Sequence, residues 1–192
     1  MSETHTPTRW QQSILAQWDE SLSRQASRAE EIAAGLTDED LVRRPGEGRW
    51  SVAHCLEHLA TTITEYRPFL EGAIAKREAR GDRDFPDYRP GAFARWFIGM
   101  AGPGKKALPA PKRFRPSDET ANPDAVARFV SAVGEMRALL TRADAVNVNA
   151  TKFRSPVTPL LRFRIGEGFD LVIQHNDRHL GQAERARAEV RG

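Results

Sequence analysis

The sequence has 192 residues, of which 40% are hydrophobic and 29% are charged. This length and composition predict a single globular domain over residues 1–192 and exclude a disordered chain. No apolar run approaches the roughly eighteen residues of a membrane span, and the polar N-terminus lacks a signal-peptide core. A single cysteine, Cys55, excludes an internal disulfide framework, so we expect a cytoplasmic protein without a membrane partner.

The charge balance bears on nucleic-acid binding. The net charge is +3, from 29 basic and 26 acidic residues whose signs are mixed along the chain. Nucleic-acid-binding proteins usually gather their basic residues on one face. Only the segment from Lys105 to Arg115 approaches such a cluster, so a nucleic-acid partner is not expected.

The first predicted helix spans about residues 9–35. Its apolar side chains recur every three or four residues, as at Ile14 and Trp18, with polar residues between them. Residues 37–41 suit a further short helical turn. The polar residues 1–8 are expected to form a flexible tail.

Ser51 is a favoured N-cap residue and begins the second predicted helix. An apolar stripe from Val52 to Ile74 follows at helical spacing, and the pattern fades near residues 76–80. Pro68 lies within this stripe. Proline inside a helix removes a backbone hydrogen bond, so either a kink or an adjustment of the preceding turn is expected there.

Residues 81–121 differ in composition, because seven of the 12 prolines lie between Pro86 and Pro123. Within them, residues 93–100 suit a helix of two turns. So long an irregular segment is usually functional or disordered. Its apolar side chains favour a packed lid over a free linker.

Asn122 and Pro123 predict the start of a third long helix, with a cap followed by proline at the first helical position. Residues 143–164 are expected to be a loop without paired strands, and a last helix spans about residues 166–190. Four long amphipathic helices, with a long proline-rich crossover between the second and third, predict an all-α fold, a four-helix bundle.

Four of the five histidines form two pairs of equal spacing, His54 with His58 and His175 with His179. Side chains four residues apart share one helix face, which lets two imidazoles reach one metal ion. On a helical projection His175 and His179 face inward. His58 lies at the flank of the apolar stripe, and His54 points farther round. The spacing therefore favours a metal site over a buried structural pair. His175 and His179 are candidate ligands, His58 is the better candidate from the second predicted helix, and His54 is the weaker.

The segment from His54 to His58 also matches the inverted zinc-peptidase pattern H-x-x-E-H, in which Glu57 would be the general base. The helical projection instead directs His54 and Glu57 toward solvent, and no third ligand follows. We therefore interpret both as part of a solvated face. Cys55 lies nearer the core and is expected to be a small buried thiol.

The residues around these histidines resemble a known family. The sequences Arg49-Trp-Ser-Val-Ala53 leading to His58-Leu59, and His175-Asn-Asp-Arg-His179-Leu with Gln182, are similar to the DinB-like family, named for DNA-damage-inducible proteins. Pro109-Ala-Pro111, Phe114-Arg-Pro116 and Lys152-Phe-Arg-Ser-Pro156 extend the similarity over nearly the whole chain. Asn176 stands where relatives often carry Asp.

This resemblance implies a bundle of up-down-down-up connectivity and one divalent metal ion held by three histidines, which match His58, His175 and His179. Such a site suits zinc, nickel, iron or manganese, and zinc is the ion we expect. Family members do not use the position of His54 as a ligand. A fourth histidine there would close the metal to substrate.

Characterised relatives include thiol transferases that use low-molecular-weight thiols such as bacillithiol, and a mycothiol-dependent isomerase. The resemblance thus implies a metal-dependent enzyme that activates a thiol, as an S-transferase, or water, as a hydrolase. Thr62 and Gln182, each about one turn beyond a histidine, are candidates to hydrogen-bond a ligand. The basic side chains of residues 102–116 would attract an anionic thiol cofactor. The alternative is a non-catalytic metal-binding or stress-response protein whose metal is structural.

The helical projection also bears on assembly. It places Ile173 and Leu180 on the outward side of the last helix. Paired with outward apolar residues elsewhere, they would form a dimer patch, so we expect a homodimer.

Overall fold

The computed structural model describes residues 10–82, 84–104 and 111–191. The described part is mostly helical, which confirms the all-α prediction. Within these ranges the elements are α1 (Ser13–Ala33), α2 (Asp38–Val42), α3 (Val52–Glu78), α4 (Ala92–Ala101), the 3-10 helix η1 (Lys112–Phe114), α5 (Ala125–Ala143), β1 (Lys152–Arg154), β2 (Arg162–Arg164) and α6 (Ile165–Arg191). The tail predicted for residues 1–8 lies outside the described ranges.

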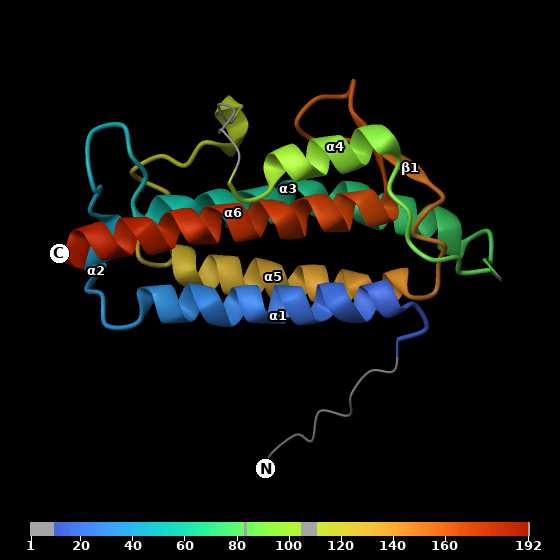
Figure 1. Cartoon of the computed structure of the whole chain (residues 1–192), viewed down its shortest axis with the longest axis horizontal. Coiled ribbons are helices and arrows are strands. Elements are labelled where there is room, and N and C mark those ends of the chain that lie inside the picture. Colours follow the sequence, from blue (N-terminus) through green and yellow to red (C-terminus); the bar gives the residue numbers. More distant parts are fainter. Residues whose placement is uncertain (1–9, 83, 105–110, 192) are drawn as a thin grey trace, which may run out of the picture.

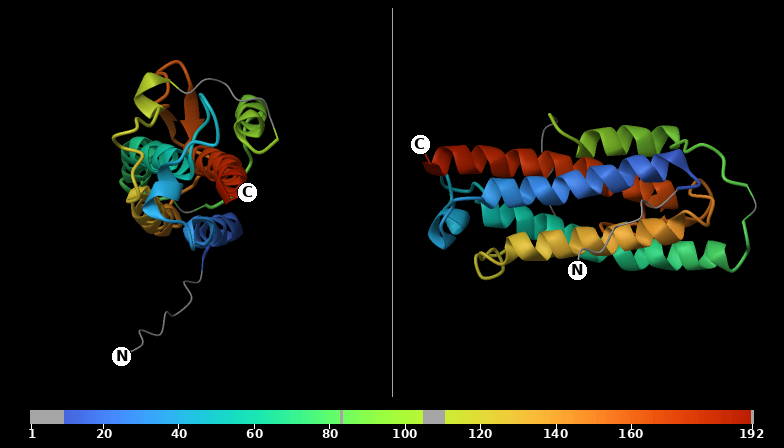
Figure 2. Two further views of the ribbon diagram at one scale, coloured as in Figure 1. Left: turned by 90° about the vertical axis from the view of Figure 1, so that its left-hand side faces the viewer. Right: turned by 90° about the horizontal axis from the view of Figure 1, so that it is seen from below.

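The long helices α1, α3, α5 and α6 lie lengthwise beside one another (Figure 1), and the end-on view of Figure 2 shows them around a common axis. α3 packs against α5 and α6, and α1 packs against the same two helices, so the core lies between all four. In Figure 1, the chain runs from right to left in α1 and α6 and from left to right in α3 and α5. α4 packs on α6 from outside this group. No helix in the described part of the chain has the length and apolar character needed to cross a membrane.

Local sequence signals set several helix ends. The Ser51 hydroxyl caps α3 by accepting a hydrogen bond from the His54 amide at 3.2 Å, as predicted. Thr37 and Asp40 form a capping box on α2, the predicted short helix. α1 ends at Ala33, two residues before the predicted end, and begins at Ser13 rather than near residue 9. Gly35, with a φ of 71°, follows the end of this helix. α3 continues through Pro68.

The insert between α3 and α5 contains the expected two-turn helix, which is α4. Ile98 of α4 and Phe114 of η1 are buried, so these described parts pack against the bundle as predicted. Residues 105–110, which include Lys105 and Lys106, lie outside the described ranges.

Two further expectations about element boundaries are wrong. α5 begins at Ala125 rather than at Pro123, because the Asn122 side chain accepts a hydrogen bond from the Asp124 amide at 3.1 Å and forms a turn before the helix. Residues 143–164 are not a plain loop, since β1 and β2 pair antiparallel with Phe153 opposite Phe163. Strands of three residues are too short for an alternating pattern to identify them.

The prediction of an outward apolar face on α6 is also wrong. Ile173 is 4% exposed and Leu180 is 0% exposed. α6 contacts α1, α3 and α4, and a helix with neighbours on several sides buries more than one stripe. The homodimer therefore stays a prediction without the patch on which it depended.

Two glycines let aromatic side chains approach the start of α6 closely. A Cβ atom on Gly166 would lie 2.7 Å from a ring carbon of Tyr88, and one on Gly168 would lie 2.6 Å from Cζ of Phe153. Because carbon atoms do not pack at such distances, larger residues would push both rings away from α6.

Candidate metal centre

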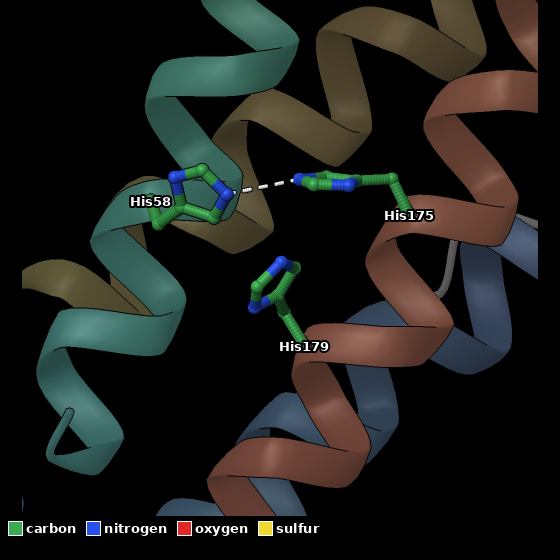
Figure 3. Close-up of side chains that lie close together, drawn as sticks. All are labelled: His58, His175 and His179. Carbon is green, nitrogen blue, oxygen red and sulfur yellow. Dashed lines mark hydrogen bonds between the residues drawn. The ribbon is translucent and has the colours of Figure 1, made fainter. Parts of the chain in front are cut away.

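Three histidines from two neighbouring helices converge between α3 and α6 (Figure 3). His58 comes from α3, and His175 and His179 come from successive turns of α6. One ring nitrogen of each lies within 4.8 Å of the others, and the Nε2 atoms of His58 and His175 are 2.9 Å apart. Across the described residues, no other group of three histidine, cysteine or acidic side chains gathers this closely.

Hydrogen bonds fix which nitrogen of two of these rings is free to bind an ion. Nδ1 of His58 lies 2.6 Å from the carbonyl oxygen of Phe114. Since a carbonyl only accepts, Nδ1 carries the proton and donates it, and Nε2 keeps its lone pair. In the same way Nδ1 of His179 donates to Oε1 of Gln182 at 3.0 Å. Metal-binding histidines typically donate their second ring nitrogen in this manner.

Burial keeps the imidazoles neutral. Removal from water lowers the pKa of His58. It is also the main cause that lowers the pKa of His175 well below its usual range, and the neighbouring rings of His179 and His58 lower it further. For the same reasons the pKa of His179 falls to about 3. A neutral imidazole is the form that binds a metal, so the three rings are in the right state at neutral pH.

The spacing of the nitrogens fits a shared ion. Two nitrogens bound to one ion at about 2.1 Å lie roughly 3.0 to 3.4 Å apart for right to tetrahedral angles. The 2.9 Å between the Nε2 atoms of His58 and His175 is close to this range. Without an ion the contact requires His175 to donate, because Nε2 of His58 has no proton.

The cluster opens to a cavity of about 630 Å³. The Trp50 ring covers one side of the histidine cluster, with its ring centroid 4.9 Å from that of His58 and 5.6 Å from that of His179. The apolar lining further includes Tyr66, Trp96, Phe97, Met100, Ala101, Pro111, Phe114, Val157, Leu161, Leu171, Val172 and Ala186. Its polar lining includes Arg49, Thr62, Arg178, Gln182 and Arg185. A cavity of this size admits a small molecule next to the histidines.

Comparison with known families identifies the chain. A family model of the DinB superfamily matches residues 21–183. The chain belongs to the DinB superfamily. The match includes all three clustered histidines, and it confirms the resemblance seen in the sequence. No curated protein and no solved structure matches the chain.

The residues predicted to support the ligands of this DinB superfamily site differ in their contacts. Gln182 holds Nδ1 of His179, as described above. The Thr62 hydroxyl lines the cavity but donates to the backbone carbonyl of His58 at 2.8 Å, so its contact with a ligand stays a prediction. Asn176 donates to Gln25 of α1 at 2.9 Å.

His54 lies outside the cluster, but the prediction that it faces solvent is wrong. It is 2% exposed. Its Nδ1 lies 2.7 Å from Oγ of Ser51, and its Nε2 lies 3.0 Å from Oδ1 of Asp118 and 2.8 Å from Nη2 of Arg44. Asp118 and Arg44 lie on other segments of the chain, so the projection of a single helix does not include their contacts with this ring. With both ring nitrogens engaged, His54 does not supply a fourth ligand.

The remaining residues of the H-x-x-E-H pattern also have structural contacts. Glu57 was expected in solvent, but its side chain is 12% exposed and pairs with Arg128 of α5 at 2.7 Å. It is thus held away from the histidines, and the peptidase interpretation gains no support. Cys55 is buried as predicted, and burial raises the pKa of its thiol to about 12.

Several cavity residues were not predicted. The contact from Phe114 is made by a backbone carbonyl, which leaves no side-chain pattern to detect. Trp50 belongs to the motif that resembles the family, yet nothing in the pattern places its ring against the histidines. Arg178 and Arg185 did leave a signal, because spacings of three and ten residues from His175 keep them near its helix face.

Gln182→Ala is expected to weaken metal binding about 10- to 100-fold, because Nδ1 of His179 loses the acceptor that orients its ring. Competition between the protein and a chromophoric zinc chelator measures the affinity. Gln174→Ala is the matched control, a glutamine of α6 that lies outside the cavity lining. Equal affinities in the two variants would show that Gln182 does not orient a ligand.

Proposed function

We propose that this protein binds one divalent metal ion through His58, His175 and His179 and is a metal-dependent enzyme. The observation that carries the proposal is the convergence of three neutral imidazoles on one cavity, those of His58 and His179 buried and that of His175 half-buried. Zinc is the proposed ion, and nickel, iron or manganese would also suit three nitrogen donors. We assign the bundle the up-down-down-up connectivity that the family resemblance implies.

The proposed chemistry is activation of a thiol for transfer to an electrophile, with activation of water as the alternative. A bound divalent ion supplies Lewis acidity that brings the pKa of a coordinated thiol or water to near neutrality. The chain's own residues hold the ligands and shape the site. Phe114 and Gln182 orient two rings, and Trp50 shields the cluster from water. The cavity volume supports binding of a low-molecular-weight thiol beside a second reactant.

A purely structural metal is less consistent with this arrangement. A structural ion is usually enclosed by four protein ligands, whereas a catalytic ion keeps an open position. Among the residues that the structure describes, no cysteine or carboxylate joins the three histidines. His54 is held by Ser51 and Asp118. These contacts support an ion that is accessible from the cavity.

Metal-loaded protein is expected to accelerate conjugation of a low-molecular-weight thiol to chlorodinitrobenzene or monobromobimane. A panel of bacillithiol, mycothiol, glutathione and cysteine, followed by absorbance or fluorescence, tests this. His179→Ala should reduce the rate to that of the uncatalysed reaction, and His54→Gln should retain it. Wild-type rates that equal the uncatalysed rates after loading with zinc, nickel, iron and manganese in turn would refute thiol transfer. Ester hydrolysis by the same preparations would support the alternative, activation of water.

A further inference from the structure

Among the described residues that line the cavity, every side chain with a full charge is an arginine. Arg49 enters from the loop before α3, and Arg178 and Arg185 enter from α6. Among the described lining residues there is no Asp, Glu or Lys. A partly enclosed cavity with charges of one sign concentrates ligands of the opposite sign.

Most other arginines near this end of the bundle already have partners. Arg187 and Arg191 donate to backbone carbonyl oxygens at the C-terminal end of α1, where unpaired carbonyls need donors. Arg49 forms a two-bond pair with Glu189. The fixed contacts of these three side chains contribute to packing of the fold rather than to binding in the cavity.

Arg185 differs from them. It makes no hydrogen bond or ion pair with any residue that the structure describes. The adjacent Glu184 is bound by Arg28 through bonds of 2.6 and 2.8 Å. Burial is the main cause that lowers the pKa of Arg178, and the positive charge of Arg185 lowers it further. The two cations therefore repel each other. An anion near both would relieve this repulsion.

The cavity is elongated along α6. Its α6 lining extends from Leu171 to Ala186, which is about 22 Å at the helical rise of 1.5 Å per residue. The metal-site histidines lie between these ends. Arg185 lies six residues beyond His179, and helical side chains lean toward the N-terminus, which directs its side chain back toward the histidines. The opposite end is lined by apolar residues such as Phe97 and Leu161.

We propose that the cavity takes an elongated amphiphilic anion, with a carboxylate, phosphate or sulfonate group at Arg185 and an apolar body along α4 and α6. A reactive group between the two ends of this ligand would lie beside His58, His175 and His179. As a statement about the substrate class, the inference rests on the proposed function. Binding itself needs only the cavity and Arg185, and can be measured without metal.

Two fluorescent dyes test the proposal on metal-free protein. 8-Anilinonaphthalene-1-sulfonate and N-phenyl-1-naphthylamine share one apolar body and differ by the sulfonate group. Fluorescence titration is expected to show about tenfold tighter binding of the anionic dye, because hydrogen bonds to charged groups contribute most. Arg185→Gln should remove about this tenfold preference and leave the neutral dye unaffected. Trp96→Ala should weaken both dyes, since Trp96 lines the apolar part.

Arg95→Gln is the matched control. Arg95 is an exposed arginine of α4 outside the cavity lining, so its loss should change neither affinity. Near-UV circular dichroism verifies that each variant keeps the wild-type fold. Equal binding of the two dyes to wild type, or equal losses in Arg95→Gln and Arg185→Gln, would overturn the proposal. If the protein binds the dyes as expected but takes up no metal, the proposed function is refuted and the proposed binding of an anion stands.

Discussion

Protein carrying His175→Ala is expected to purify with almost no divalent metal, whereas the wild-type chain should hold about one ion. The reason is that His175 is one of the three proposed ligands and its Nε2 lies only 2.9 Å from that of His58. Two remaining imidazoles on different helices would bind an ion far more weakly. Elemental mass spectrometry on untagged protein after dialysis measures the content of both chains in parallel.

His54→Gln is the matched control for this experiment. It removes a histidine from the same helix as His58, but one whose ring nitrogens contact Ser51, Asp118 and Arg44 instead of the cluster. It should retain about one ion per chain. Loss of metal in His54→Gln but not in His175→Ala would show that the ligands are wrongly assigned.

Mild acid is expected to destabilise the metal-free protein strongly. In the unfolded chain a histidine takes up a proton as the pH falls through about 6.5. In the folded chain the pKa of His179 is about 3, so the ring stays neutral and the unfolded state binds more protons. The free energy of unfolding therefore falls as the pH is lowered through this window. For His179 alone the loss is about 2 kcal/mol between pH 6.5 and 5.

His58 and His175 add to this effect, because burial lowers the pKa of both. Urea unfolding between pH 7.5 and 5 measures it, in a range above the ordinary pKa values of exposed carboxyl groups. His179→Gln, which does not titrate there, should show a shallower pH dependence than wild type. A free energy of unfolding that is constant or rises toward pH 5 would contradict the burial of neutral imidazoles.

The helical projection predicted the directions of the three clustered histidines correctly, because these directions depend only on helix geometry and on the position of the apolar stripe. Residues four apart share a face, and the buried face of each helix was marked by its apolar stripe. His175 and His179 thus had to point the same way, and His58 adjoined the stripe of α3. The convergence of these three rings follows once α3 and α6 pack together.

The same projection was wrong where a second element covers the helix. The segment 115–121 brings Asp118 over His54, and α5 brings Arg128 to Glu57. Ile173 and Leu180 lie on a helix that has neighbours on several sides. A single-helix pattern contains no information about such coverage. The short strands β1 and β2 and the shape of the cavity depend on long-range contacts as well.

Diffraction from crystals of zinc-saturated protein, measured on both sides of the zinc absorption edge, tests the metal centre most directly. The expected result is one strong anomalous peak between α3 and α6, about 2.1 Å from Nε2 of each of His58, His175 and His179. Such a peak would also show whether the remaining coordination positions face the cavity. Crystals that show no peak there, or show their strongest peak at other residues, would contradict the three-histidine site.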